Sequence, residues 1–364
     1  MNSVSDVRYM KLALGLGQRG QGNVWPNPAV GCVLVKKDRI IGRGWTQPGG
    51  SPHAEVMALA QAGSQAQGST AYVTLEPCSH YGVTGPCAEG LVTAGIHRCV
   101  VAMIDPDARV SGAGIAKLEA AGINVDLGCM SAQAKISHYG FCTRVTKGRP
   151  RVTLKLAMSL DGRIATLNGE SQWITAPSSR RDVHSFRARH DAVLVGSGTA
   201  KADNPSLIVR ELGCISQPVR IIASSKLDFL GDALKSSRDI APLWLCHGVD
   251  PAGKGAWLGS CDELLEIPQT ANGQLDVVAM FQVLGNKGLT SIFCEGGGSL
   301  AASLLKAGLI DDLIIYTAGL AIGADGLAGV ADLALSRLME ARRFSLESCC
   351  KLGPDVRQHW RATH

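Results

Sequence analysis

Long hydrophobic runs, aromatic side chains and clustered positive charge are all scarce in this sequence. No apolar stretch approaches the roughly 20 residues that a helix needs to cross a bilayer, so we expect no membrane span. Aromatic residues make up 5% of the chain, and the net charge of +5 comes from scattered lysines and arginines, which does not indicate a nucleic-acid-binding surface. The opening residues, MNSVSDVRYMKLAL, do not have the basic segment and apolar core of a secretory signal, which predicts a cytoplasmic protein.

The length and composition indicate a globular protein of two domains. The chain has 364 residues, which is long for one average domain and sufficient for two, each with its own core. Hydrophobic residues make up 46% and charged residues 18%, as in folded rather than disordered proteins. Twelve cysteines in such a chain predict reduced thiols, most of them small core residues, with two or three available as metal ligands.

Short apolar runs alternate with helical patterns through most of the chain, which predicts an α/β fold with mostly parallel strands. The predicted strands are Gly31–Val35, Ala71–Leu75, Cys99–Ile104, Val152–Ala157, Ala192–Gly196, Val219–Ala223, Leu243–Cys246, Ser291–Cys294 and Leu313–Thr317. The predicted helices of the first half are Ala54–Ala62, Ala88–Ala94 and Gly114–Ala121. The polar stretch TKGRPRV, Thr146–Val152, separates the halves, so we place the domains at residues 1–147 and 148–364.

The stretch PHAEV puts His53 and Glu55 at the start of an otherwise apolar helix. Downstream, Cys78 and Cys87 each follow a proline, with eight residues between the two cysteines. A proline is tolerated in the first turn of a helix, so Cys87 is predicted to begin one, where orphan N–H groups favour a thiolate.

One imidazole and two thiolates form a ligand set that suits zinc and leaves a fourth position for water. The metal would lower the pKa of that water toward neutrality. Glu55, close to His53 but not itself a ligand, is predicted to take the proton of the water and return it to a leaving amine. This arrangement is typical of zinc-dependent deaminases that act on nucleobases.

Two simpler interpretations compete with a catalytic zinc site. His53 and Glu55 would cap a helix in the first, with both cysteines in the core. The second is a structural zinc site, which normally uses four protein ligands. The two proline-preceded cysteines in the next strand–loop–helix unit favour the catalytic interpretation, although nucleoside deaminases usually space their cysteines more closely.

The second half contains a glycine-rich turn and two isolated arginines. SIFC leads into Gly296–Gly298 and then an amphipathic helix, Ser299–Ala307, so that backbone N–H groups can approach a phosphate. The pattern is not the spaced Rossmann fingerprint, and such a turn often has no ligand. Arg187 and Arg210 are either solvated charges or a guanidinium fork for a ribose phosphate.

Several motifs together resemble one family, the bifunctional riboflavin-biosynthesis deaminase/reductase. They are NPAVGCVLV, PHAEVMALA, AYVTLEPCSHYG and Asp105–Pro106 in the first half, and LKLAMSLDGRIAT, GESQWIT, GSGTAKADNPSLIVR and EGGGSL in the second. The resemblance covers nearly the whole chain, and the wide cysteine spacing is normal in that family. It implies an N-terminal cytidine-deaminase-like three-layer domain and a C-terminal dihydrofolate-reductase-like domain.

The resemblance also implies two consecutive reactions on a small phosphorylated pyrimidine. The first is the zinc-dependent hydrolytic deamination of 2,5-diamino-6-(5-phosphoribosylamino)pyrimidin-4(3H)-one. The second is the NADPH-dependent reduction of the ribosyl group to a ribitylamino group. One Zn²⁺ per deaminase domain, NADPH, and a homo-oligomer formed through the reductase domain are therefore expected, with no nucleic-acid or membrane partner.

The site residues follow from the resemblance, motif by motif. Glu55 is the expected catalytic residue, and the expected zinc ligands are His53, Cys78 and Cys87. The expected substrate-binding residues are Asn27, His80, Ser171, Arg187, Leu207, Arg210 and Glu295. The expected NADPH-binding residues are Ala157, Trp173, Thr199, Asp203, Ser225, Gly297, Gly298, Ser299, Leu300, Ala301, Ala302 and Ser303. Lys155 and Asp203 are the polar groups expected near the sugar carbon, and the sequence does not decide which of them donates a proton.

Three positions depart from the usual family pattern around the deaminase substrate. Thr46 replaces a histidine, Val83 replaces a lysine or arginine, and Asp107 replaces an asparagine. Losing one charge-assisted contact to a phosphate costs about 1.5–3 kcal/mol. In the second half, Ser224 replaces an aspartate and Ala318–Gly323 replaces a segment with proline and lysine. An alternative is therefore a deaminase with weakened or altered specificity, acting on another aminopyrimidine.

Two further alternatives belong to other functional classes. An RNA-base deaminase with an appended binding domain would bind RNA in a salt-sensitive way, which the scattered basic residues disfavour. A non-catalytic paralogue is disfavoured by the intact His53, Glu55, Cys78 and Cys87.

Overall fold

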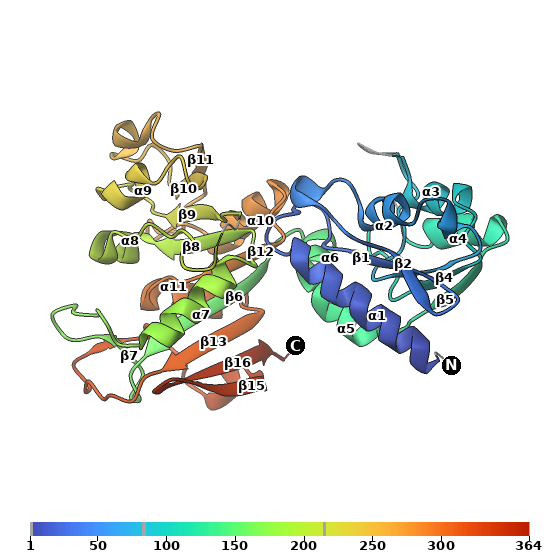
Figure 1. Cartoon of the computed structure of the whole chain (residues 1–364). Coiled ribbons are helices and arrows are strands. Elements are labelled where there is room, and N and C mark those ends of the chain that lie inside the picture. The colour runs from blue at the N-terminus through green and yellow to red at the C-terminus, as the bar shows by residue number, and fades with distance from the viewer. Residues whose placement is uncertain (1–2, 82–84, 109, 214–215, 364) are drawn as a thin grey trace. The chain divides into compact units, whose positions relative to one another are not determined.

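The computed structural model describes residues 3–81, 85–108, 110–213 and 216–363. The chain forms two compact units, Met1–Gly148 and Arg149–His364, each built around its own β-sheet (Figure 1). Among the helices in the described ranges, none has both the length and the apolar character needed to cross a membrane.

The first unit contains a five-stranded sheet in the order β2-β1-β3-β4-β5. The strands are β1 (Gly31–Lys36), β2 (Arg39–Trp45), β3 (Thr70–Val73), β4 (Arg98–Val101) and β5 (Asn124–Leu127). β1 pairs antiparallel with β2 and β3, whereas β3, β4 and β5 run parallel. The carboxyl ends of β3 and β4 therefore lie at the same edge of the sheet.

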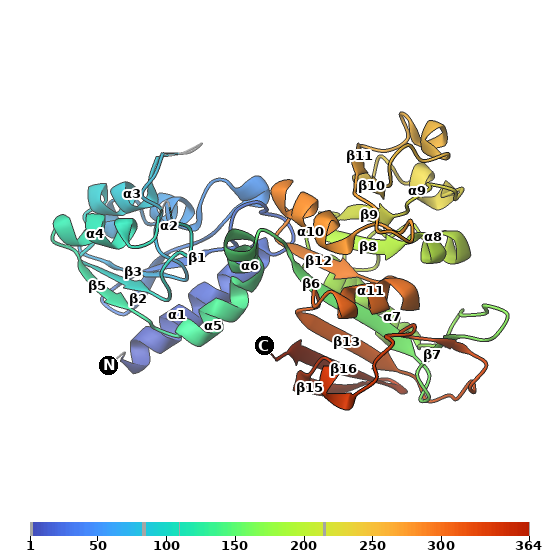
Figure 2. The same cartoon turned by 180° about the vertical axis from the view of Figure 1, so that it is seen from behind.

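The side chains of β1 show how three layers form in this unit. Successive side chains of a strand point to opposite faces. Accordingly, Cys32 and Leu34 pack in one buried core, and Val33 and Val35 pack in another. Helices cover both faces of the sheet (Figures 1 and 2).

One face of this sheet carries three helices and the other carries two. The first core includes residues of α2 (Ala54–Ala62), α3 (Cys87–Thr93) and α4 (Ala113–Ala120). The second core includes residues of α1 (Val4–Gly17) and α5 (Ser131–Ser137), and α6 (Tyr139–Lys147) follows.

The second unit contains a nine-stranded sheet in the order β11-β10-β9-β8-β12-β6-β13-β16-β15. Neighbouring strands are parallel from β11 to β13, whereas β16 pairs antiparallel with β13 and β15. The strands are β6 (Arg151–Met158), β8 (Ala192–Gly196), β9 (Val219–Ala223), β10 (Leu243–His247), β11 (Glu263–Glu266), β12 (Ser291–Cys294), β13 (Asp312–Thr317), β15 (Phe344–Leu352) and β16 (Asp355–Ala362). The helices are α7 (Pro177–Arg187), α8 (Ser197–Asp203), α9 (Asp232–Ser236), α10 (Val277–Asn286) and α11 (Gly298–Lys306). β7 (Arg163–Ala165) and β14 (Leu327–Ala328) form a separate pair.

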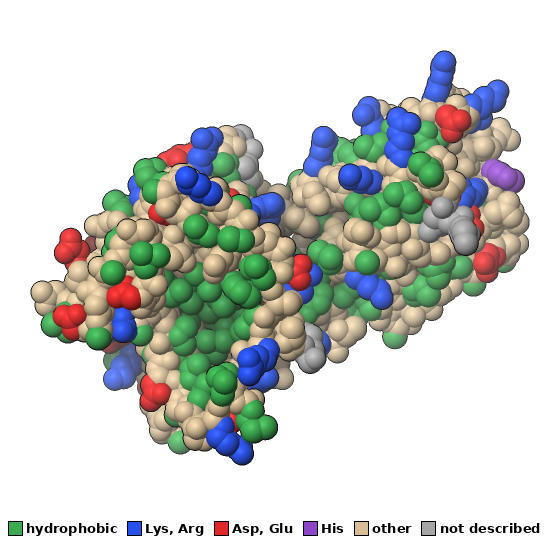
Figure 3. All heavy atoms as spheres, turned by 90° about the horizontal axis from the view of Figure 1, so that it is seen from below, with side chains coloured by type: hydrophobic (Ala, Val, Ile, Leu, Met, Phe, Trp, Pro, Cys, Tyr) green, Lys and Arg blue, Asp and Glu red, His purple; other side chains and the backbone are tan. Residues whose placement is uncertain are grey.

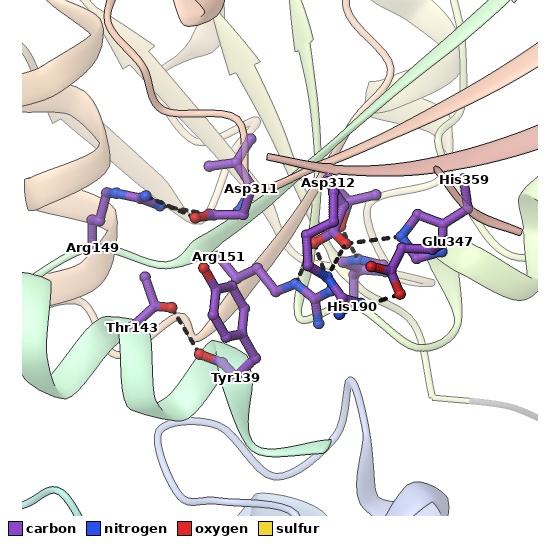
Figure 4. A network of polar contacts seen from close by, with 12 residues as sticks. Tyr139, Thr143, Arg149, Arg151, His190, Asp311, Asp312, Glu347 and His359 are labelled. Carbon is purple, nitrogen blue, oxygen red and sulfur yellow. Dashed lines mark hydrogen bonds and ion pairs between the residues drawn. The ribbon is translucent and has the colours of Figure 1, made fainter. Parts of the chain in front are cut away.

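Ion pairs hold the beginning of β6 against the beginning of β13. Arg149 forms a two-bond fork with Asp311, at 2.7 and 2.9 Å. Arg151, two residues further along the chain, pairs with Asp312. Asp312 also accepts a hydrogen bond from Nε2 of His359 on β16 (Figure 4). Asp312 is 1% exposed, so the network is a buried clamp across three strands.

Candidate active sites

The ligand atoms of His53, Cys78 and Cys87 lie together, although the residues come from three segments. His53 is the N-cap residue of α2, Cys87 is the first residue of α3, and Cys78 follows β3. Nδ1 of His53 is 3.3 Å from Sγ of Cys87 and 3.6 Å from Sγ of Cys78, and the three atoms lie within 4.8 Å of one another. The ordinary Zn–S and Zn–N bond lengths of a tetrahedral site would place such atoms about 3.6 Å apart. The three side chains therefore fit one zinc ion.

The start of α3 stabilises negative charge at this cluster. Sγ of Cys78 accepts a hydrogen bond from the backbone N–H of Cys87 at 3.3 Å, one of the N–H groups that a helix start leaves unpaired. Hydrogen bonding from the Cys87 side chain lowers the pKa of Cys78 to about 4, against the opposing effect of burial. These contacts favour the thiolate form at this pair of cysteines, which is the form that binds metal.

Glu55 lies beside the cluster as the second residue of α2 and is only 4% exposed. Burial, and then the charge of Cys78, raise the pKa of Glu55 to about 7. A carboxyl group with such a pKa can both accept and release a proton near neutrality. The structure thus places a buried carboxyl group with a raised pKa next to three potential ligands.

The second candidate site lies at one edge of the nine-stranded sheet. β6, β8, β9 and β12 are parallel neighbours, so their carboxyl ends meet at this edge, where α/β sheets usually bind ligands. Ala157, Thr199, Ser225 and Glu295 lie at these strand ends or in the segments that follow them, and α11 begins at Gly298.

Glu295 is the centre of a buried polar group at this edge. Nε and Nη2 of Arg187 donate to its carboxylate at 2.5 and 3.0 Å, and Nζ of Lys155 is 4.0 Å away. Burial lowers the pKa of Lys155, despite the opposing charge of Glu295. Burial also raises the pKa of Asp203, while Lys155 and a hydrogen bond from Ser171 act in the opposite direction. Five of the residues named from the sequence are therefore within one connected group.

Comparisons with known proteins match both units. The family model of the RibD C-terminal domain matches residues 150–357, and that of the cytidine and deoxycytidylate deaminase zinc-binding region matches residues 3–103. The riboflavin biosynthesis protein RibD of Escherichia coli (strain K12) is 41% identical over 368 residues, which cover 98% of this chain and 99% of that protein. The chain belongs to the RibD family.

Solved structures of RibD-family proteins agree with the computed fold over the full length. Acinetobacter baumannii RibD is 36% identical, with a TM-score of 0.87 over 99% of each chain. The deaminase/reductase from Thermotoga maritima is 32% identical, with a TM-score of 0.86 over 98% of this chain and 99% of that one. The chain therefore has a cytidine-deaminase-like domain followed by a RibD reductase domain.

This RibD-family chain is an enzyme of riboflavin biosynthesis with deaminase and reductase activities. Its two matched domains imply a zinc ion in the first and a nicotinamide cofactor in the second. The full-length match does not favour the alternatives of another aminopyrimidine substrate or an RNA-base deaminase.

Two of the departures from the family pattern lie among the described residues of the first unit, and Val83 lies outside them. Thr46 is 2% exposed, and its hydroxyl donates to the carbonyl of Pro28 and accepts from the N–H of Val30. The hydroxyl is therefore used inside the fold. The N–H of Asp107 donates to Asp105 at 2.8 Å. Of the expected substrate residues, His80 is exposed, and Asn27 donates to the carbonyl of Gly50 at 2.9 Å.

Several expected contacts of the RibD reductase domain can come only through the backbone. The side chains of Leu207, Ala301 and Ala302 are at most 5% exposed and belong to the core. Trp173, in contrast, is 67% exposed, with the guanidinium of Arg180 4.5 Å from its ring.

Sequence reasoning missed His184, which lies on α7 and is 7% exposed. Its Nδ1 accepts a hydrogen bond from the backbone N–H of Arg210 at 3.3 Å, which fixes the loop that carries this arginine. Burial, followed by the charges of Arg187 and Arg210, lowers the pKa of His184. A histidine on an amphipathic helix has no sequence signal that separates it from a core residue.

Proposed function

We propose that the first unit deaminates 2,5-diamino-6-(5-phosphoribosylamino)pyrimidin-4(3H)-one and that the second unit reduces the ribosyl group of the product with NADPH. The observation that carries the proposal is the trio of His53, Cys78 and Cys87 beside the buried carboxyl group of Glu55. The Thermotoga maritima protein of similar structure is a diaminohydroxyphosphoribosylaminopyrimidine deaminase and 5-amino-6-(5-phosphoribosylamino)uracil reductase, which supports these substrates.

In the deaminase step, His53, Cys78 and Cys87 would hold a zinc ion, which would supply Lewis-acid activation of a water molecule. Glu55 takes a proton from that water, because its pKa of about 7 makes it basic enough at neutral pH. The same carboxyl group then delivers the proton to the amine that leaves the pyrimidine ring. Asn27 and His80 are assigned to substrate binding.

In the reductase step, bound NADPH would supply a hydride to C1′ of the sugar. We assign the cofactor to the sheet edge formed by Ala157, Thr199, Asp203 and Ser225, together with Trp173 and the run from Gly297 to Ser303. The N-terminal end of α11, with glycine at residues 297 and 298, allows backbone N–H groups to approach phosphate oxygens.

The substrate of the reductase is assigned to Ser171, Arg187, Leu207, Arg210 and Glu295. Lys155 is the better candidate for the proton donor, because burial lowers its pKa and thereby eases the loss of its proton. Glu295 and its partner Arg187 orient this ammonium group.

We also propose that the chain assembles as a homo-oligomer through its second unit. Leu338 and Met339 are 78% and 76% exposed, and Leu346 on the edge strand β15 is 51% exposed. Figure 3 shows hydrophobic side chains gathered around a hollow on this unit. Extended exposed apolar surface commonly marks a protein–protein interface.

The decisive experiment incubates the purified protein with the diaminopyrimidine ribosyl phosphate, with and without NADPH. We expect the deaminated pyrimidine alone without NADPH, and the ribitylamino product when NADPH is added, both identified by mass spectrometry. No mass change in either reaction would refute the proposal, and a product formed equally well with NADH would refute the choice of NADPH.

A further inference from the structure

The carboxylate of Glu76 is buried two positions before the ligand Cys78 and is not used by the proposed chemistry. Glu76 is 3% exposed and accepts hydrogen bonds from four backbone N–H groups of one distant segment. These donors are Gly112 at 2.9 Å and Asp105 at 3.2 Å on Oε2, and Gly114 at 2.9 Å and Ile115 at 3.2 Å on Oε1. All four positions for hydrogen bonds on the carboxylate are thus directed at the β4–α4 connection and the first turn of α4.

Three of these donors form the N-terminal end of α4. Gly112 is the N-cap residue and has no side chain to cap the helix, while Gly114 and Ile115 lie in the first turn. N–H groups at this position have no partner within the helix. Glu76 therefore supplies both the missing acceptors and a negative charge at the positive end of the helix dipole.

The sheet places this contact directly beside the zinc ligands. β3 and β4 are parallel, and their pairing continues past both strand ends, with Ala102 donating to Val73 and Glu76 donating to Met103, each at 3.0 Å. The segment that carries Cys78 and the segment that begins at Asp105 consequently run next to each other.

The β4–α4 segment also carries a group close to a residue that we assign to substrate binding. Asp105 lies within electrostatic reach of His80, which we assign to substrate binding. Asp105 in turn accepts from the N–H of Asp107, one of the positions that depart from the family pattern. The placement of these groups depends on where the segment is held.

The first turn of α4 has no room to shift toward the segment that carries Cys78. A Cβ atom on Gly114 would lie 1.9 Å from the carbonyl oxygen of Pro77, which is bonded directly to Cys78 in the chain. The backbone of Gly114 therefore packs directly on the backbone of Pro77. The Glu76 carboxylate holds these two segments together through its hydrogen bonds.

We propose that Glu76 is a positioning residue of the deaminase, which fixes the wall formed by residues 105–108 and 110–112 against the strand end that carries Cys78. The inference rests on the proposed deaminase function and assigns Glu76 no contact with the substrate. A purely structural role would change the stability of the unit without changing the KM of the folded enzyme. A positioning role changes KM.

The test is the Glu76→Gln variant of the full chain, loaded with zinc. Glutamine keeps the shape of the side chain, but its NH₂ group presents donors to two of the four N–H groups, so two hydrogen bonds are replaced by repulsion. We expect the KM for the diaminopyrimidine ribosyl phosphate to rise on the order of 10- to 100-fold, as for other displacements of about 1 Å in an active site. Zinc should remain at about one per chain, and the reductase kinetics of the same sample should not change.

Glu119→Gln is the matched control, because Glu119 is exposed on the same helix and undergoes the same chemical change. It should have wild-type KM in both reactions. Glu76→Asp keeps the charge but shortens the reach by one methylene, so its KM should lie between those of the wild type and Glu76→Gln.

A zinc-loaded Glu76→Gln protein with wild-type KM overturns the proposal, even if its melting temperature is lower. If that variant does not fold, the Glu76→Asp and Gly114→Ala variants replace it in the test, because both displace the same wall. Wild-type KM in both of these variants would also overturn the proposal. A wild-type protein that fails to deaminate the pyrimidine overturns the proposed function itself, which is a separate result.

Discussion

The guanidinium of Arg187 at the end of α7 forms a two-bond fork with the carboxylate of Glu295, 108 positions further along the chain. Nη1 of Arg187 also donates to the carbonyl of Ile208 at 3.0 Å. Three of the five N–H donors of this arginine are therefore used inside the fold. Arg187 fixes the geometry of Glu295 and retains at most two donors for a substrate phosphate.

Replacing Arg187 with lysine should impair the reductase although the charge is retained. A lysine ammonium cannot reproduce the planar fork, so Glu295 loses its orientation. We expect kcat/KM for the reduction to fall roughly 10- to 100-fold, which corresponds to about 1.4–2.7 kcal/mol. Steady-state measurements of NADPH oxidation would show this, while the deaminase reaction of the same sample stays at the wild-type rate.

Arg189→Lys is the control for that change, because Arg189 is exposed and its guanidinium contacts Ser185 and the ring of Phe186, both on α7. It should retain wild-type kcat/KM. An Arg187→Lys protein with the same kinetics as Arg189→Lys would contradict the role given to the fork.

Replacing Glu55 with glutamine should stop deamination without removing the metal. The amide fits the same buried space but cannot accept and return a proton, so kcat should fall by about 10²–10⁴-fold. Zinc should remain at about one per chain by elemental analysis, because Glu55 is not among the three ligands. Normal deamination by this variant would exclude Glu55 as the proton carrier, and unchanged reduction serves as the internal control.

Removing the metal should separate the two activities. Chelation at neutral pH should abolish deamination, because the cluster of His53, Cys78 and Cys87 is the only group of three such ligands among the described residues. The reductase should retain its activity, and added Zn²⁺ should restore the deaminase. Loss of both activities on chelation would show that the second unit depends on metal as well.

The apolar strands of both units were predictable, because parallel strands buried on both faces appear as continuous apolar runs. β8, β9 and β12 have the predicted bounds. For each of the other predicted strands, the observed bounds differ from the predicted bounds by at most three residues at either end. The antiparallel strands β15 and β16 gave no such signal. Most side chains of β15 are exposed, so polar residues interrupt the apolar residues of its sequence and no continuous apolar run forms.

The grouping of His53, Cys78 and Cys87 could be predicted from residue types and spacing. The pairing of residues distant in sequence could not. Nothing in the sequence indicates that Glu295 binds Arg187, or that Glu76 binds backbone groups of α4, because such partners are set by tertiary packing. Thr46 illustrates the same limit, since only the structure shows that its hydroxyl is occupied by Pro28 and Val30.

The buried carboxylate of Asp312 should contribute strongly to the stability of the second unit (Figure 4). Burial alone would raise the pKa of Asp312, but the hydrogen bond from His359 and the charge of Arg151 lower it to about 2. Replacing Asp312 with asparagine removes the buried carboxylate that pairs with Arg151, His359 and Arg361. We expect the free energy of unfolding at pH 7 to fall by roughly 3–5 kcal/mol, measured by urea unfolding followed through reductase activity and circular dichroism.

The pH dependence of this loss distinguishes charge from packing. Because the pKa of Asp312 is depressed in the folded state, its stabilising effect is fully present above the unfolded value of about 4 and is lost as the pH falls toward about 2. The difference between wild type and Asp312→Asn should therefore shrink below pH 4. Asp325→Asn, an exposed control, should change the stability by less than about 0.5 kcal/mol at any pH. A difference for Asp312→Asn that stays the same at pH 3 and pH 7 would assign the effect to packing, and the ion-pair clamp would then contribute nothing measurable.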